Sequence, residues 1–299
     1  MKHTPKYKML LLSAAQAIAF AVILATMLSA CGGLPEMAGT TEATTEVTTE
    51  VTTEVTTEAT TEATEIRELK ENPYQADDFY KENDFLYCST TKTVVCIDVS
   101  RYQGNVNWEK VKAAGVNYVI MRAGGRGTGS SGTMFTDANV VKYYQDAREA
   151  GLKVGFYFFS QAKTEIEARE EAQFVLELVK DWQVDLPIVC DWEYNEKYRV
   201  KNLTKTEATN CVKAFCETVE AAGYQSMFYC TDFTAHQKLD LQQLRQFGIW
   251  YADYERFLGF EYKVDMWQYS DTGKVSGISG KVDLNVLFLE DTIFEGKLN

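Results

Sequence analysis

The chain has 299 residues, with 30 Lys or Arg against 43 Asp or Glu, so its formal net charge is -13. This acidic balance argues against a phosphate-binding surface, and we expect no nucleic-acid partner. The two histidines, His3 and His236, lie far apart, so we expect no zinc site. We also expect no other metal and no cofactor. The length allows one or two domains.

The first thirty residues have the features of a secretory leader. Three lysines lie among the first eight residues, and an apolar run follows from Met9 to Met27. The next residues, Leu28-Ser-Ala-Cys31, resemble the bacterial lipobox. We therefore expect residues 1–30 to be a lipoprotein signal peptide and Cys31 to be lipidated, which anchors the chain to the outer face of the cell membrane. The alternative is an uncleaved membrane helix, since the run approaches spanning length.

Residues 31–65 contain a low-complexity stretch. From Thr40 to Glu65 the unit Thr-Thr-Glu followed by Ala or Val recurs every four residues, without Lys, Arg or an aromatic residue. Such a segment buries too little apolar surface to offset the entropy of ordering it. We therefore expect a disordered, charge-extended tether that holds a folded domain away from the membrane, within the cell wall.

Six cysteines follow Cys31, and an even number outside the cell permits disulfides. However, Cys96, Cys190 and Cys230 lie in apolar, strand-like runs, where a cysteine is more often a small buried hydrophobe. We do not expect three disulfides, and the pairing stays open.

From residue 94 onward, short β-branched or aromatic runs alternate with helical stretches. This alternation predicts a parallel sheet built of right-handed βαβ units. Too little chain separates the last three strands for full helices, so we expect an α/β, TIM-like barrel, (β/α)5(β)3, over residues 94–299. The predicted strands are Val94–Val99, Tyr118–Ala123, Lys153–Phe159, Pro187–Asp191, Ser226–Thr231, Ile249–Tyr254, Val264–Tyr269 and Val282–Phe288. The predicted helices are Trp108–Ala114, Asp137–Ala150, Thr164–Val179, Thr204–Ala222 and Leu239–Phe247.

Residues 66–93 come before the first predicted barrel strand. They carry four large aromatic residues that can bury against another surface: Tyr74, Phe79, Phe85 and Tyr87. We expect this segment to be an arm that packs on the outside of the barrel.

Acidic residues occur at three predicted strand ends, where parallel barrels place their functional groups. Asp98 ends the first strand, Asp191 and Glu193 end the fourth, and Asp283 begins the eighth. Asp191 and Glu193 are two residues apart, so they share one strand face, roughly 6.6 Å apart along the chain. Burying paired carboxylates is costly for stability, and acids gathered at one barrel mouth suggest cleavage of a glycosidic bond.

Each of these acids also has a structural interpretation. Asp98 could cap the following loop, Asp191 and Glu193 could form a solvated loop or a divalent-cation site, and Asp283 could be a turn residue. Their joint occurrence at three strand ends favours the catalytic interpretation. Aromatic residues crowd the same ends and could stack on sugar rings. With nearby polar residues they form the predicted substrate-binding set: Tyr102, Gln103, Arg122, Tyr157, Tyr229, Tyr251, Asp253, Trp267, Gln268 and Tyr269.

Four motifs carry a resemblance to a known family. They are Asp98-Val-Ser-Arg-Tyr-Gln-Gly104, Leu186-Pro-Ile-Val-Cys-Asp-Trp-Glu193, Ile249-Trp-Tyr-Ala-Asp253, and Trp267-Gln-Tyr269 with the later Gly277-Ile-Ser-Gly-Lys-Val-Asp283. Their order and spacing resemble glycoside hydrolase family 25, the Chalaropsis-type lysozymes, over about residues 95–288. The resemblance implies a (β/α)5(β)3 barrel that hydrolyses the β-1,4 bond between N-acetylmuramic acid and N-acetylglucosamine in peptidoglycan.

The resemblance also implies residue roles. Glu193 matches the general acid and Asp191 its partner carboxylate, while Asp98 and Asp283 match the aspartates of the first and last motifs. Many family members have Tyr-His-Phe after the third strand where this chain has Tyr157-Phe-Phe, so any role of that histidine does not transfer. We expect a monomer that acts on peptidoglycan glycan strands.

For the mechanism, we expect the neighbouring charges of Asp98 and Asp191 to keep Glu193 protonated. Asp191 then either orients the substrate's 2-acetamido group as the internal nucleophile, which the resemblance favours, or activates water. Two alternative functions stay open. A chitinase-like or N-acetylglucosaminidase barrel is one, although its Asp-x-x-Asp-x-Asp-x-Glu run is absent. The other is a non-catalytic wall-binding lipoprotein.

Overall fold

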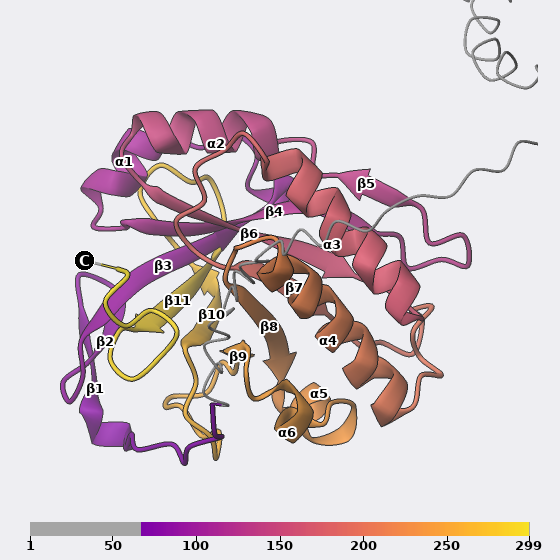
Figure 1. The fold of residues 1–299 in the computed structure, drawn as a ribbon. Coiled ribbons are helices and arrows are strands. Elements are labelled where there is room, and N and C mark those ends of the chain that lie inside the picture. Colours follow the sequence, from indigo (N-terminus) through magenta and orange to yellow (C-terminus); the bar gives the residue numbers. More distant parts are fainter. Residues whose placement is uncertain (1–66, 299) are drawn as a thin grey trace, which may run out of the picture. The chain divides into compact units, whose positions relative to one another are not determined.

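A computed structural model describes residues 67–298 (Figure 1). The expected signal peptide, the expected lipidation site at Cys31 and the expected tether over residues 31–65 lie outside this described part. Within residues 67–298, no helix is both long enough and apolar enough to cross a membrane.

Among the described residues, eight strands close into a barrel. The first strand pairs with both the second and the last, which completes the ring. The expected (β/α)5(β)3 fold class is therefore confirmed. The strands are β3 (Thr93–Val99), β4 (Tyr118–Arg126), β6 (Lys153–Ser160), β7 (Ile188–Trp192), β8 (Ser226–Thr231), β9 (Gly248–Ala252), β10 (Met266–Gly273) and β11 (Val282–Phe288).

Helices follow each of the first five barrel strands and lie on the outside of the ring (Figure 1). Local side-chain caps explain where several begin: Asn107, Thr164 and Thr204 each accept a hydrogen bond from a backbone N–H of the first helical turn. The helices are α1 (Trp108–Ala113), α2 (Val140–Glu149), α3 (Glu165–Val179), α4 (Lys205–Ala221), α5 (Asp232–Gln237) and α6 (Leu241–Leu244).

The single helix predicted over Leu239–Phe247 is wrong in its bounds. Thr231 caps a first short helix, α5, directly after β8. The Asp240 side chain then accepts a hydrogen bond from the Gln242 N–H and starts α6, which is only one turn long. The predicted range therefore contains only the one-turn α6, and α5, which precedes that range, was not predicted.

The last strand runs against its neighbours, so the prediction of an entirely parallel sheet is wrong there. β10 is parallel to β9, whereas β11 is antiparallel to both β10 and β3. A parallel pair needs a crossover of about a dozen residues or more, and the segment between β10 and β11 is shorter. The first residues of β11 consequently lie at the same barrel end as the last residues of β3.

A glycine fixes the loop that leads into β11. Gly277 has a φ of +98°, and its carbonyl accepts a hydrogen bond from the Asn107 N–H at 2.8 Å. A Cβ atom at this position would lie 2.3 Å from the Asn107 carbonyl oxygen. The loop can therefore approach the start of α1 only with glycine here.

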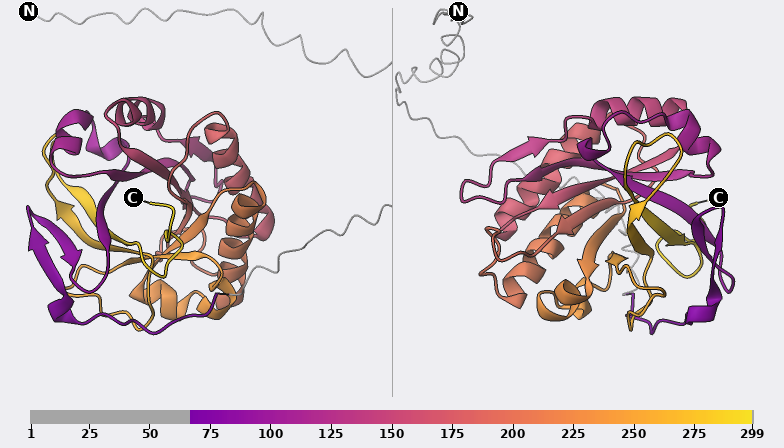
Figure 2. Two further views of the ribbon diagram at one scale, coloured as in Figure 1. Left: turned by 60° about the vertical axis from the view of Figure 1, so that its left-hand side comes forward. Right: turned by 180° about the vertical axis from the view of Figure 1, so that it is seen from behind.

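Two apolar layers hold the barrel together. The outer layer lies between the sheet and the helices, and the inner layer fills the barrel interior. Phe294 and Leu298, from the C-terminal segment, belong to the inner layer together with Trp250 and Met266. In the left view of Figure 2 the segment before the C-terminus overlies the ring of strands, and its buried side chains place it at one end of the barrel. The six cysteines in the described part are buried and free of disulfides.

The segment before β3 packs on the barrel wall beside β10 and β11 (Figure 2). It contains an antiparallel hairpin of β1 (Phe79–Glu82) and β2 (Phe85–Cys88). Tyr74 stacks on Phe288 with ring centroids 4.7 Å apart, and Phe79 meets Trp267 edge-on at 5.2 Å. At its start, Arg67 forms two hydrogen bonds of 2.8 and 2.9 Å to the buried Asp265 carboxylate.

Sequence patterns did not predict the two hairpin strands, β1 and β2, or one further strand. β5 (Met134–Thr136) pairs antiparallel with the end of β4, which extends three residues beyond its predicted end at Ala123. A Cβ atom on Gly124 would lie 2.2 Å from the Phe135 carbonyl oxygen, so a larger residue there would push β5 away.

Candidate active site

Four carboxyl side chains converge at the barrel mouth. Asp98 comes from β3, Asp191 from β7, Glu193 from the residues just after β7, and Asp283 from β11. They lie close enough together for the charge of Asp98 to raise the pKa of each of the other three. The structure thus brings together all four acids that the sequence singled out.

Asp98 is almost completely buried and holds its charge through two amide donors. Its Oδ2 accepts hydrogen bonds from Gln268 Nε2 and from Asn285 Nδ2, each 2.9 Å long. Burial raises the pKa of Asp98, and these two donors lower it because they stabilise the carboxylate. Asp98 is therefore the acid in the cluster that is best arranged to be ionised.

Further hydrogen bonds fix which way the two amides point. Trp250 Nε1 donates to Asn285 Oδ1 at 2.9 Å, and the Tyr254 hydroxyl donates to Gln268 Oε1 at 2.8 Å. Since both amide oxygens already accept from a donor, both amide nitrogens face Asp98. The four side chains form a shell that holds one oxygen of Asp98 in place.

Asp283 shares a proton with Asp98. The two residues are direct partners in the antiparallel β3–β11 pair, and their carboxyl groups are hydrogen-bonded. Burial, followed by the charge of Asp98, raises the pKa of Asp283 to about 8. Near neutral pH, Asp283 consequently keeps its proton and donates it to the Asp98 carboxylate.

Asp191 and Glu193 form the second half of the cluster. Burial raises the pKa of Asp191 well above its usual range, the charges of Glu193 and Asp98 raise it further, and Arg122 opposes them. Burial and then the charge of Asp98 also raise the pKa of Glu193. Asp191 Oδ1 is buried and accepts no hydrogen bond from residues 67–298. This oxygen is therefore available to a donor on a bound molecule.

Arg122 links the acids to an exposed aromatic ring. Its Nε donates to Asp137 Oδ2 at 2.7 Å, and the Asp137 side chain is fully buried. The Arg122 guanidinium also lies 5.1 Å from the centroid of the Tyr102 ring, which is 73% exposed. Tyr102 thus presents an open aromatic face at the mouth, backed by a cation.

Two tyrosines extend from the barrel interior towards the acids. Tyr157 and Tyr229 pack edge-on against Trp250, with ring centroids 6.1 and 5.2 Å away. Burial raises the pKa of both hydroxyl groups well above the usual tyrosine range, and the neighbouring acids add to this shift. Both hydroxyl groups therefore stay protonated and can donate hydrogen bonds.

Three residues of the predicted substrate-binding set lie elsewhere. Trp267, Tyr269 and Tyr251 belong to the outer apolar layer and are buried there. Successive residues of a strand point to opposite faces, so Gln268 faces the interior while Trp267 and Tyr269 face outward. The assignment of these three aromatic residues to the barrel mouth is therefore corrected.

The remaining two predicted residues support loops beside the mouth. Gln103 Oε1 accepts a hydrogen bond of 2.8 Å from the Ser100 N–H, which closes the turn after β3. Asp253 follows β9, and its carbonyl oxygen accepts a hydrogen bond from Trp267 Nε1 at 2.8 Å. The structure gives both residues a local structural partner.

Four residues near the acids were not predicted: Trp250, Asn285, Tyr254 and Asp137. Asn285 had a detectable signal, since it lies two residues after Asp283 and so shares its strand face. Trp250 and Tyr254 had no comparable signal, because their roles depend on Asn285 and Gln268, which come from other strands.

A barrel of five βα units and three further strands, with acids gathered at its mouth, has the architecture and the functional groups of a glycoside hydrolase. The chain belongs to family 25 of the glycosyl hydrolases, whose family model matches residues 97–278. The resemblance seen in the four motifs is thereby confirmed at the level of the family.

Individual relatives agree with this assignment. The autolytic lysozyme of Clostridium acetobutylicum is 27% identical over 198 residues, which is 63% of this chain and 54% of that protein. The structure of the modular autolysin LytC from Streptococcus pneumoniae in complex with a synthetic peptidoglycan ligand is 26% identical, with a TM-score of 0.58, over 66% of this chain and 47% of that one. This chain therefore spans about half the length of these two relatives.

A third relative matches over almost its whole length. The structure of a family 25 glycosyl hydrolase from Bacillus anthracis has a TM-score of 0.58 and covers 71% of this chain and 96% of that one. At 21% identity this likeness concerns the fold, and it extends to nearly all of that protein.

Proposed function

We propose that this protein is a muramidase that hydrolyses the β-1,4 bond between N-acetylmuramic acid and N-acetylglucosamine in peptidoglycan. The observation that carries the proposal is the convergence of Asp98, Asp191, Glu193 and Asp283 at the mouth of a family 25 barrel. The relatives named as lysozyme and autolysin support it.

Glu193 is the general acid in this proposal. Its pKa is raised by burial and by the charge of Asp98, so a larger fraction of the side chain is protonated near neutral pH. It donates this proton to the bridging oxygen as the glycosidic bond breaks. The Gln161 side chain donates a hydrogen bond of 3.0 Å to the Glu193 carbonyl oxygen and so holds the backbone here.

Asp191 orients the substrate's 2-acetamido group. The charge of Glu193 raises the pKa of Asp191, and this effect disappears while Glu193 holds its proton. Arg122 then favours the ionised form of Asp191. The buried, unpartnered Oδ1 of Asp191 can accept a hydrogen bond from the acetamido N–H, which turns the acetamido oxygen towards the anomeric carbon.

Asp98 stabilises the positive charge that develops on the sugar ring. Its carboxylate is fixed by Gln268 and Asn285, so it needs little reorganisation as that charge appears. Asp283, held protonated beside it, limits the number of negative charges in the cluster. The roles of Tyr102, Tyr157 and Tyr229 are to contact the glycan, through the ring face of Tyr102 and the hydroxyl groups of the other two.

We also propose that the enzyme works as a lipoprotein monomer at the outer face of the cell membrane. The support is in the sequence: a basic and apolar leader, the Leu28-Ser-Ala-Cys31 motif, and the Thr/Glu-rich residues that follow. A Cys31→Ser variant is expected to lose the lipid and to leave the membrane fraction. Retention of that variant in the membrane would favour an uncleaved membrane helix instead.

The test of the activity is a digest of purified peptidoglycan by the full-length protein, with products reduced and analysed by mass spectrometry. New reducing-end muramic acid is expected. Reducing-end glucosamine would place the cut at the other bond and favour an N-acetylglucosaminidase or chitinase-like enzyme. No products from a folded protein that remains bound to the wall would favour a non-catalytic binding lipoprotein.

A further inference from the structure

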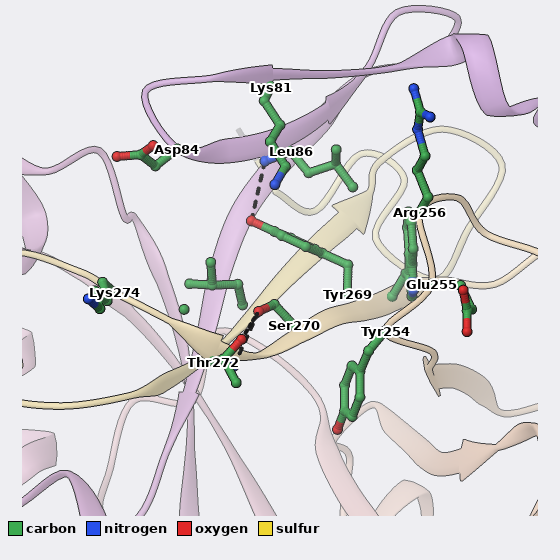
Figure 3. Close-up of a pocket in the computed structure, with 13 residues that line it drawn as sticks. Lys81, Asp84, Leu86, Tyr254, Glu255, Arg256, Tyr269, Ser270, Thr272 and Lys274 are labelled. Atoms are coloured by element: carbon green, nitrogen blue, oxygen red, sulfur yellow. Dashed lines mark hydrogen bonds between the residues drawn. The ribbon is translucent and has the colours of Figure 1, made fainter.

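A large cleft lies outside the barrel wall, between the β1–β2 hairpin and the end of β10 (Figure 3). Its volume is about 660 Å³. The lining includes the apolar side chains of Leu86, Trp267, Tyr269 and Leu284, each of which is at most 8% exposed. The Leu86 N–H donates to the Tyr269 hydroxyl at 3.2 Å, which ties the hairpin to the barrel at the cleft.

Three cations line this cleft without a partner. Lys81, Arg256 and Lys274 are exposed, and none forms an ion pair or a side-chain hydrogen bond with another residue of the described part. In contrast, Arg67, Arg122, Arg126, Arg148 and Arg199 are all ion-paired. Three such cations therefore line one cleft and are free to meet negative charges on a bound molecule.

Two acids also line the cleft. Asp84 and Glu255 are exposed, and their carboxylates accept no hydrogen bond from residues 67–298. The cleft thus combines an apolar surface with charged groups of both signs, the cations being in excess. Such a lining suits a short peptide that carries carboxylates and an amino group. A neutral sugar has no charges that could complement those of the cleft.

The cleft adjoins the candidate active site. Tyr254 lines the cleft, and its hydroxyl donates to Gln268 Oε1 at 2.8 Å. Gln268 Nε2 in turn donates to Asp98 Oδ2 at 2.9 Å. The cleft wall and the Asp98 carboxylate are therefore two hydrogen bonds apart.

We propose that this cleft binds the peptide stem that peptidoglycan carries on its muramic acid residues, while the glycan occupies the barrel mouth. This inference rests on the proposed function. A stem of four residues extends roughly 13 Å, and Tyr254 and Gln268 link the cleft to the acids that the glycan would meet. Its carboxylates meet the three cations, its free amino group meets Asp84 or Glu255, and its alanine methyl groups contact the apolar surface.

The hairpin lies outside the part of the chain that matches the family model, so the shared family residues alone do not form the proposed binding site. Lys81, Asp84 and Leu86 all precede residue 97, where the match to the family model begins. An anionic wall polymer built of phosphodiesters is the competing occupant, but Asp84 and Glu255 would repel it.

The first test compares two substrates with the full-length protein: stem-bearing glycan strands, and the same strands after an amidase has removed the stems. The double variant Lys81→Glu, Lys274→Glu is expected to lose roughly tenfold in kcat/KM on the stem-bearing strands and to keep its rate on the stripped ones. The control Lys297→Glu, which reverses an exposed charge outside the cleft, is expected to match the wild type on both. Equal rates of the double variant and the wild type on stem-bearing strands would overturn the inference, as would an equal loss on both substrates.

The second test does not depend on catalysis. The free stem tetrapeptide is titrated into each protein and followed by NMR or calorimetry, after circular dichroism has established equal folding. Binding to the wild type and to Lys297→Glu, but not to the double variant, is expected. Absence of binding to the wild type, or tighter binding of poly(glycerol phosphate) than of the stem, would overturn the inference. If the wild type bound the stem yet cleaved neither glycan, the muramidase proposal would fail while the cleft assignment stood.

Discussion

Asp98 and Asp283 lie directly opposite one another in the antiparallel β3–β11 pair, and their carboxyl groups share one proton. Only the reversed direction of β11 makes this possible, because it brings the second residue of that strand level with the sixth residue of β3. The number of negative charges in the proposed active site therefore depends on whether Asp283 holds its proton, and so on pH.

Asp283→Asn should increase thermal stability at alkaline pH. The pKa of Asp283 is raised from 3.8 to about 8 in the folded protein. The stability that protonated Asp283 contributes is therefore fully present at pH values below 3.8, the pKa of this group in the unfolded chain. This contribution is lost as pH rises through about 8. Asparagine has no proton to lose and can still donate to Asp98. We expect a gain in Tm of about 3 °C at pH 9.

Calorimetry of both proteins between pH 4 and pH 9 measures the effect of Asp283→Asn. The difference in Tm should grow with pH and level off above the pKa of about 8. A difference that is constant with pH, or largest in acid, would contradict the proton-sharing pair.

Glu193→Gln should abolish most turnover and leave the fold intact. Glutamine keeps the size of the side chain but cannot supply the proton to the leaving oxygen, so we expect kcat to fall by about 10²–10⁴-fold. The measurement is the release of reducing ends from peptidoglycan. Glu149→Gln on α2, which removes an exposed carboxylate outside the barrel mouth, serves as the matched control and should keep full activity. Near-normal turnover by the Glu193 variant would remove Glu193 from the proposed role.

Asn285→Asp should impair the enzyme most strongly in acid. The change removes the Nδ2 donor to Asp98 and adds a like charge, so it raises the pKa of Asp98. Loss of a hydrogen bond to a charged group predicts a fall in kcat/KM of about 10–100-fold. The acidic limb of the pH–rate profile should also move to higher pH. The control is Asn117→Asp at an exposed loop position; an unshifted profile for the Asn285 variant would show that Asp98 needs no amide donor.

Arg122→Gln should act on both stability and pH dependence. It leaves the buried Asp137 without its cation, which we expect to cost about 3 kcal/mol in the free energy of unfolding. It also removes the charge that lowers the pKa of Asp191, so the acidic limb of the activity profile should shift upward. Denaturant titration and a pH–rate profile measure the two effects. Arg122→Lys, which keeps the charge, should show a smaller pH shift; equal shifts in both variants would exclude a charge effect.

Much of the barrel could be predicted because its strands are short runs of β-branched and aromatic residues between capped helices. The direction of β11 was not predicted from such a run, since a run has the same composition in either direction. The direction of β11 can instead be inferred from the segment between β10 and β11, which is too short for a parallel crossover.

The four acids could be predicted because a charged residue at the end of an apolar strand is conspicuous. In contrast, the face of the strand on which each aromatic residue lies could not be predicted. Both faces of a barrel strand are buried, so hydrophobicity does not reveal which of Trp267 and Gln268 points inward. The amide shell around Asp98 depends on contacts between residues about 170 and 187 positions apart, which no local pattern contains.

The ring of strands is closed by its first and last members, and the same two strands carry Asp98 and Asp283. A chain that stops before β11 lacks both the closure and half of the proton-sharing pair. Completion of the polypeptide and assembly of the acid cluster are thus a single event. A chain that ends before β11 therefore cannot assemble even part of the Asp98–Asp283 pair, so the cluster is complete only when the final strand is in place.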